Sequence, residues 1–172
     1  MAGAGTPEHR HPPGPHRPTD HPSLTRRPIH LRWRSLVLVA TGGLAGTATR
    51  ELLTLAAPPS GGFPAATFLI NISGAFVLGL LLDALARRGP DEGRLQALRL
   101  LAGTGFCGGF TTYSALATDT ALLVGEGDTG SAMLYAFGTL LAGGAASWAG
   151  IVVAERLHSL CARSGNGSRR TT

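Results

Sequence analysis

The sequence predicts an all-helical integral membrane protein with four transmembrane helices, the third of them broken in mid-membrane. Three observations carry this prediction. Four apolar stretches, near residues 35–56, 65–86, 96–124 and 130–153, are each long enough to cross a bilayer. Glycines and hydroxyl residues interrupt the middle of the third stretch, and the arginines gather on one side of the resulting topology. At 172 residues the chain is one folding unit, with a membrane domain over 35–157 between two tails.

Both tails have compositions that favour disorder. Residues 1–34 hold seven of the eleven prolines, six arginines and five of the six histidines, with little that can form a core. The histidines are spaced irregularly among prolines, which argues against a metal site. No short apolar region precedes residue 35, so we expect no cleavable signal peptide. Residues 158–172 form the second predicted disordered tail.

The first apolar stretch, 35–56, would measure about 33 Å as a helix, enough to cross the hydrocarbon core. Gly42 and Gly46 form a G-x-x-x-G pair that favours close helix contact. Arg50 lies near its far end and has two interpretations. It is either an interfacial side chain that reaches toward water, or a cation at the mouth of an anion path.

The second and fourth stretches each carry polar side chains that need partners. Asn71 is a lipid-embedded amide, so it either makes an interhelical hydrogen bond or presents a donor to an anion. Asp83 precedes Arg87 by one turn, which predicts an ion pair at the end of the span. Tyr135 and Thr139 lie one turn apart on the fourth stretch and either bond backbone carbonyls or line a polar path.

The third stretch is too long for one straight crossing. Its thirty residues from Leu95 to Val124 would measure about 45 Å as a helix, against a core of about 30 Å. Each interior glycine weakens a helix by roughly 1 kcal/mol relative to alanine. We therefore expect two half-helices, with the hydrogen-bond ladder opening near Gly108. The glycines are Gly103, Gly105, Gly108 and Gly109, and the candidate caps for the second half are Thr111, Thr112 and Ser114.

Opening a helix at membrane depth leaves carbonyls without partners. These oxygens must face protein, an ion or trapped water. Helix breaks of this kind mark ion and substrate sites in transport proteins. Asp119, two turns into the second half, lies deeper than the other acidic residues, and an intramembrane carboxylate is a functional candidate.

The basic residues predict the orientation in the membrane. All fifteen are arginine, and the three segments that share one side of a four-crossing topology hold most of them. The opposite side has only Arg50, so the positive-inside rule predicts cytoplasmic N- and C-termini in the plasma membrane. The charge therefore indicates lipid headgroups rather than nucleic acid. Twelve arginines lie on the predicted cytoplasmic side: six in residues 1–34, then Arg87, Arg88 and Arg94 in the middle loop, and Arg163, Arg169 and Arg170 at the C-terminus.

An enzyme is not expected. Residues 103–108 match G-x-G-x-x-G, the dinucleotide fingerprint, but no strand precedes them and the context is a membrane span. The absence of lysine from the sequence excludes a phosphate-loop lysine. No His, Cys and carboxylate set has the spacing of a catalytic metal site.

The chain from about residue 41 to 150 resembles the Fluc/CrcB family of fluoride-specific ion channels. Three motifs carry the resemblance, one in each of the first three stretches. They are Gly42-Gly43-x-x-Gly46-x-x-x-Arg50, Ile70-Asn71-x-x-Gly74-x-Phe76-x-x-Gly79, and the run Gly105-Phe-Cys-Gly-Gly-Phe-Thr-Thr-Tyr-Ser114.

The resemblance implies a channel subunit that passively exports fluoride and lowers its toxicity. It implies an antiparallel dimer with two pores and one structural sodium ion, which is not transported and is held by the backbone carbonyls of Gly108 and Thr111 from both subunits. The fluoride path would include Arg50, Asn71, Thr112, Tyr113, Ser114, Leu116, Tyr135 and Thr139. The family has phenylalanines where this chain has Tyr113 and Leu116; tyrosine keeps a ring edge with partial positive charge, whereas leucine does not.

The pairing of subunits stays open. Self-pairing in both orientations needs a weak charge bias, whereas this chain has a strong one, so a heterodimer with an oppositely oriented paralogue stands beside a homodimer. Two other functions stand as alternatives. A proton-coupled multidrug exporter needs a carboxylate inside an early span, and residues 35–49 have none. A non-conducting membrane assembly protein would tolerate loss of Asn71 and Tyr113.

Overall fold

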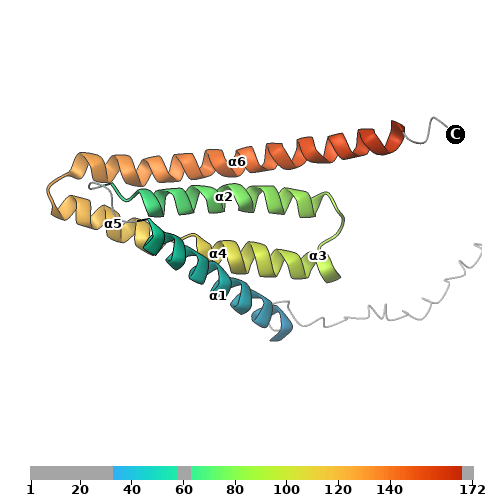
Figure 1. Ribbon diagram of the computed structural model, residues 1–172, viewed down its shortest axis with the longest axis horizontal. Coiled ribbons are helices and arrows are strands. Elements are labelled where there is room, and N and C mark those ends of the chain that lie inside the picture. Colours follow the sequence, from blue (N-terminus) through green and yellow to red (C-terminus); the bar gives the residue numbers. More distant parts are fainter. Residues whose placement is uncertain (1–32, 58–62, 168–172) are drawn as a thin grey trace, which may run out of the picture.

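The computed structural model describes residues 33–57 and 63–167, and every regular element in this part of the chain is a helix (Figure 1). The predicted N-terminal tail lies outside the described residues up to residue 32. The third apolar stretch is divided into four consecutive pieces. The elements are α1 (Trp33–Ala56), α2 (Ala65–Ala86), α3 (Gly93–Leu98), the π-helix η2 (Arg99–Cys107), α4 (Gly108–Phe110), α5 (Tyr113–Gly125) and α6 (Thr129–Gly167).

The helices form a bundle in which segments consecutive along the chain run in opposite directions, so that α2 runs parallel to α6, and α1 runs parallel to the third stretch (Figure 1). α2 lies along α6 and also contacts η2, while α1 packs across η2 and α4 (Figure 1). α5 continues beyond the interruption and packs on the beginning of α6. A small hydrophobic cluster of Leu116, Leu123, Ala132 and Tyr135 fills the junction of α5 and α6.

Two predicted boundaries are corrected by the structure. The third stretch begins with α3 at Gly93 rather than near residue 96. α6 continues through Gly167, so residues 158–167 of the predicted disordered C-terminal tail are helical. The reason is local composition: from residue 151 to 164 the sequence has no glycine or proline and is rich in good helix formers. Residues 168–172 lie outside the described part.

Two of the described helices, α2 and α6, are long and apolar enough to cross a membrane. Only 17% of the apolar stretch of α2 and 11% of that of α6 is buried within the chain, which is unlike the core helix of a water-soluble protein. α1 carries Arg50 and Glu51, and the third stretch is interrupted. That α1 and the third stretch also cross the membrane stays a prediction.

Glycines bring α1 into backbone contact with the third stretch. A Cβ atom on Gly42 would overlap the Leu101 carbonyl oxygen, and one on Gly46 would overlap that of Phe106. The predicted close helix contact at this G-x-x-x-G pair is therefore confirmed, and it is made within the chain. It sets α1 directly against the segment that leads into the interruption.

Charged residues lie at the end of α2 and at the beginning of α6. At one end the predicted ion pair between Arg87 and Asp83 is present, with Nε and Oδ2 2.5 Å apart. At the other end Asp128 caps α6, because its Oδ1 accepts the Ser131 N–H at 3.0 Å. Hydrogen bonds from the side chain and backbone of Ser131 lower the pKa of Asp128.

Replacing Gly46 with alanine is expected to destabilise the bundle by about 1–3 kcal/mol, because the added methyl overlaps a backbone oxygen that cannot move independently. Gly144→Ala is the matched control, since a Cβ there meets nothing within 4 Å. The measurement is thermal unfolding of the detergent-purified protein. Equal unfolding temperatures for the two variants would contradict the proposed backbone contact.

Candidate functional site

The helical ladder of the third stretch opens at Thr111 and Thr112. Thr111 (φ −76°, ψ 153°) and Thr112 (φ −146°, ψ 117°) are extended, between α4 and α5. Gly108 itself is helical, with φ −65° and ψ −34°, and the extended backbone follows three residues later. The Gly108 carbonyl is nevertheless the first in the ladder whose helical donor, the Thr112 N–H, is given to another partner. The glycines are accommodated within η2 and α4, and the interruption falls where the backbone finds a different hydrogen-bonding partner.

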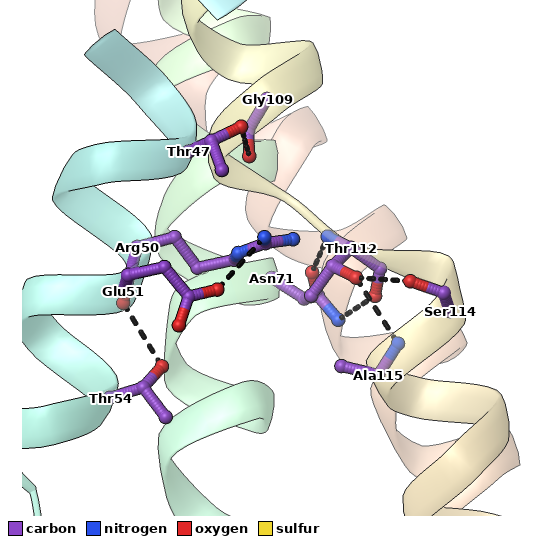
Figure 2. A network of polar contacts seen from close by, with 9 residues as sticks. All are labelled: Thr47, Arg50, Glu51, Thr54, Asn71, Gly109, Thr112, Ser114 and Ala115. Atoms are coloured by element: carbon purple, nitrogen blue, oxygen red, sulfur yellow. Dashed lines mark hydrogen bonds and ion pairs between the residues drawn. The ribbon is translucent and has the colours of Figure 1, made fainter. Parts of the chain in front are cut away.

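That partner is Asn71 on α2 (Figure 2). The Thr112 N–H donates to Asn71 Oδ1 at 2.8 Å, and Asn71 Nδ2 donates to the Thr112 carbonyl at 3.1 Å. The Asn71 side chain thus pairs with both backbone groups of one residue, in place of the two helical hydrogen bonds that Thr112 would otherwise make. Of the two interpretations of Asn71, the interhelical hydrogen bond is present. One of its two amide protons remains for another acceptor.

The side chain of Thr112 starts the second half-helix. Its Oγ1 accepts the Ala115 N–H at 3.1 Å, which identifies Thr112 as the cap among the three candidates. Ser114 Oγ lies 3.1 Å from the same oxygen. The Thr111 hydroxyl instead turns back and donates to the Cys107 carbonyl at 2.8 Å. Two hydroxyls and one amide therefore meet just beyond the interruption (Figure 2).

These bonds decide which backbone oxygens lose their helical donors. In an α-helix the N–H of Thr112 would reach the Gly108 carbonyl, but it is given to Asn71. The N–H of Ala115 would reach the Thr111 carbonyl, but it is given to the Thr112 hydroxyl. Gly108 is also exposed, and a Cβ there would meet nothing within 4 Å. Backbone oxygens of this kind suit a hard cation.

Tyr135 and Thr139 lie in a second polar group, on α6. Tyr135 is 1% exposed, and its hydroxyl donates to Asp119 Oδ2 at 3.1 Å. The ring of Phe63 meets the Tyr135 ring edge-on at 5.6 Å and 88°. The Thr139 hydroxyl donates to the Tyr135 carbonyl at 2.6 Å. Sequence reasoning noted Asp119 but not its partner, because the pairing joins two helices and leaves no local signal.

The remaining predicted site residues, Arg50, Tyr113 and Leu116, lie in three different surroundings. Arg50 pairs with Glu51 at 3.0 Å, and Figure 2 shows its side chain extending from α1 toward the interruption. Tyr113 is 79% exposed, on the surface of the single chain. Leu116 is 6% exposed and belongs to the hydrophobic cluster with Tyr135. The structure therefore brings Asn71, Thr112 and Ser114 together, places Arg50 beside them, and sets Leu116, Tyr135 and Thr139 apart.

The fold and this site define a class: a helical membrane protein in which an interrupted helix exposes backbone oxygens beside an amide, hydroxyls and an arginine. A family model described as "CrcB-like protein, Camphor Resistance (CrcB)" matches residues 37–151. The match covers more than half of the chain. The chain belongs to the CrcB family.

Individual relatives agree with this family assignment. The "Fluoride-specific ion channel FluC 2" of Leifsonia xyli subsp. xyli is 54% identical over 126 residues, which are 73% of this chain and 87% of that protein. The "Fluoride-specific ion channel FluC" of Gloeobacter violaceus is 43% identical over 127 residues, 72% of this chain and 98% of that protein. The "Fluoride-specific ion channel FluC 3" of Streptomyces avermitilis is 40% identical over 144 residues, 81% of this chain and 69% of that protein.

Replacing Asn71 with leucine is expected to destabilise the chain by about 1–3 kcal/mol for each backbone group of Thr112 left without a partner. Amide hydrogen exchange at Thr112 should become faster for the same reason. Ser73→Ala is the control on the same helix, because the Ser73 hydroxyl only bonds the carbonyl of Ile70. An unchanged Thr112 exchange rate in the leucine variant would show that Asn71 does not hold the interruption.

Proposed function

We propose that this chain is a subunit of a fluoride-selective channel that lets fluoride leave the cytoplasm passively and so lowers its toxicity. One observation carries the proposal: in a member of the CrcB family, Asn71 holds the third stretch open and gathers hydrogen-bond donors at the opening. The three relatives compared above are named fluoride-specific ion channels, which supports fluoride as the transported ion.

The chemistry of the donors suits this anion. Fluoride is small and strongly hydrated, so a pore must replace water with a dense set of donors. The free amide proton of Asn71 and the one hydroxyl proton that Thr112 and Ser114 do not use between themselves supply donors at one place. Arg50 adds positive charge at the same level of the bundle (Figure 2). Its salt bridge with Glu51 leaves other guanidinium protons available.

The exposed parts of the site support a dimer, whose subunits we propose to be antiparallel. Gly108 is exposed and Tyr113 is 79% exposed on the single chain, although both adjoin the interruption. A second subunit over this face would cover both residues and bring a second set of carbonyls. The ring of Tyr113 would then present its partly positive edge toward an anion path. Leu116 has no such edge, and Tyr135 already donates its proton to Asp119.

A structural sodium ion is part of the proposal. The carbonyls of Gly108 and Thr111, whose helical donors are used elsewhere, are the groups that would hold it. When bound, the ion would be coordinated by these oxygens in place of their missing hydrogen-bond donors and would tie two subunits together. Sodium binding by oxygen ligands requires no ionisable side chain, so the site needs no carboxylate.

The arginines support one orientation with cytoplasmic termini. Arg34, Arg87, Arg88 and Arg94 lie at the end of the bundle that also holds the end of α6, whereas the opposite end holds Arg50 with Glu51. Such a bias favours insertion in a single orientation. The proposed partner is therefore an oppositely oriented paralogue, with an ordinary homodimer as the alternative.

Purified protein in liposomes, alone or with such a paralogue, is expected to release fluoride but not chloride, as read by ion-selective electrodes. Asn71→Leu should abolish most of the flux, while Ser73→Ala should conduct like the unmodified protein. Replacing sodium by N-methylglucamine during purification should reduce flux. Absence of fluoride release in every combination would sink the channel proposal and favour a non-conducting assembly protein. Unchanged flux after the replacement of sodium would contradict the proposed structural role of sodium but would leave the channel proposal standing.

A tag-accessibility assay at the N-terminus in intact cells is expected to show a single orientation, with the tag inside. This result follows from the arginine distribution, which penalises transfer of either tail across the membrane. Replacing Arg87, Arg88 and Arg94 together with glutamine weakens the bias and serves as the sensitised comparison. Equal populations of both orientations in the unmodified chain would favour the homodimer.

A further inference from the structure

Thr47 on α1 makes a contact that its neighbours on the same helix do not. Its hydroxyl donates to the carbonyl of Gly109, on α4, at 3.3 Å (Figure 2). The other threonines of α1 bond carbonyls of their own helix, as Thr49 does to Ala45 at 2.8 Å. Bonding one turn back is the ordinary behaviour of a helical threonine. Thr47 therefore links α1 to α4, whereas the hydroxyls of the other α1 threonines bond carbonyls of α1 itself.

The contact falls on one particular oxygen of the opened ladder. The Cys107 carbonyl accepts from the N–H and the hydroxyl of Thr111, at 2.9 and 2.8 Å. The Thr112 carbonyl accepts from Asn71. Gly109, in turn, would receive the N–H of Tyr113 in a continuous helix, but the extended residues intervene. Thr47 supplies that missing donor.

Backbone packing fixes the position of Thr47. A Cβ atom on Gly109 would overlap the carbonyl of Gly43, so α1 and α4 are in direct backbone contact. Thr47 follows Gly43 by one turn on the same face of α1. The hydroxyl therefore stands at the level of the opened carbonyls and has little freedom to move away from them.

We infer that Thr47 is a positioning residue for the cation site: by holding the Gly109 carbonyl against α1, it leaves the carbonyls of Gly108 and Thr111 as those presented to sodium. The inference rests on the proposed function. Gly108 immediately precedes Gly109, so the direction of its carbonyl follows the anchoring of the next peptide. Affinity for a hard cation depends on how rigidly its oxygen ligands are held.

The test compares three variants of the full-length protein. Thr47→Val keeps the shape but removes the hydroxyl, Thr47→Ser keeps the hydroxyl, and Thr49→Val removes a hydroxyl that bonds only its own helix. Two quantities are measured against sodium concentration: the unfolding temperature of the detergent-purified protein and the rate of fluoride release from liposomes. Sodium alone is the probe, with N-methylglucamine replacing it.

Thr47→Val is expected to raise the sodium concentration at half-maximal effect roughly two- to tenfold in both measurements, the range of one lost hydrogen bond. Thr47→Ser should restore the original midpoint, and Thr49→Val should leave it unchanged. A lower unfolding temperature at every sodium concentration, with the same midpoint, would show a purely structural hydrogen bond and overturn the inference. If the valine variant does not fold, a raised midpoint in Thr47→Ala supports the inference and an unchanged one overturns it.

The two proposals fail differently. A protein that releases no fluoride, but whose sodium-dependent unfolding still shifts in Thr47→Val, contradicts the channel and supports the role of Thr47. A protein that releases fluoride, but whose unfolding and flux do not respond to sodium, overturns the role of Thr47 and leaves the channel standing.

Discussion

The pairing of Asn71 with the backbone of Thr112 is the interaction on which the rest of the site depends. In a bilayer no water is available to bond an opened peptide, and each unsatisfied group costs several kcal/mol. The amide of Asn71 donates to the carbonyl of Thr112 and accepts from its N–H, so that both backbone groups of this residue are paired. Extended geometry at Thr111 and Thr112 is tolerable because this substitute exists.

The pairing with Asn71 also changes the hydrogen bonds of neighbouring residues, because backbone N–H groups near the interruption bond side chains in place of helical carbonyls. With the Thr112 N–H given to Asn71 and the Ala115 N–H given to the Thr112 hydroxyl, the carbonyls of Gly108 and Thr111 lose the donors that a continuous helix would supply. The Thr47 hydroxyl, on α1, donates to the Gly109 carbonyl and replaces the helical donor that this oxygen lacks. The interruption is thus a selective opening, in which the side chains of α1 and α2 determine which oxygens remain available.

The second polar group has a different character. The Tyr135 hydroxyl donates to Asp119, and Leu116 packs beside it in the hydrophobic cluster. A phenol committed to a carboxylate is a poor donor to a passing anion, and the carboxylate itself repels one. In the single chain, the donors around Asn71 are therefore better placed for an anion than those on α6. Gly108 and Tyr113 are exposed on the single chain, and in the proposed dimer a second subunit would cover them.

The sequence by itself determined the helical class, the approximate extents of the four stretches, the close glycine contact on α1 and the Asp83–Arg87 pair, because each follows from spacing along one helix. It also indicated that the third stretch must be interrupted, since its length and glycine content disfavour a straight helix. It placed the opening near Gly108 and left three candidate caps after it, because helix propensity is a local property. Only the tertiary structure decided that Thr112 is the cap and pairs with Asn71, that Thr47 reaches Gly109 and that Tyr135 meets Asp119. These choices depend on which side chain of a neighbouring helix stands opposite a given peptide, and that is settled by packing.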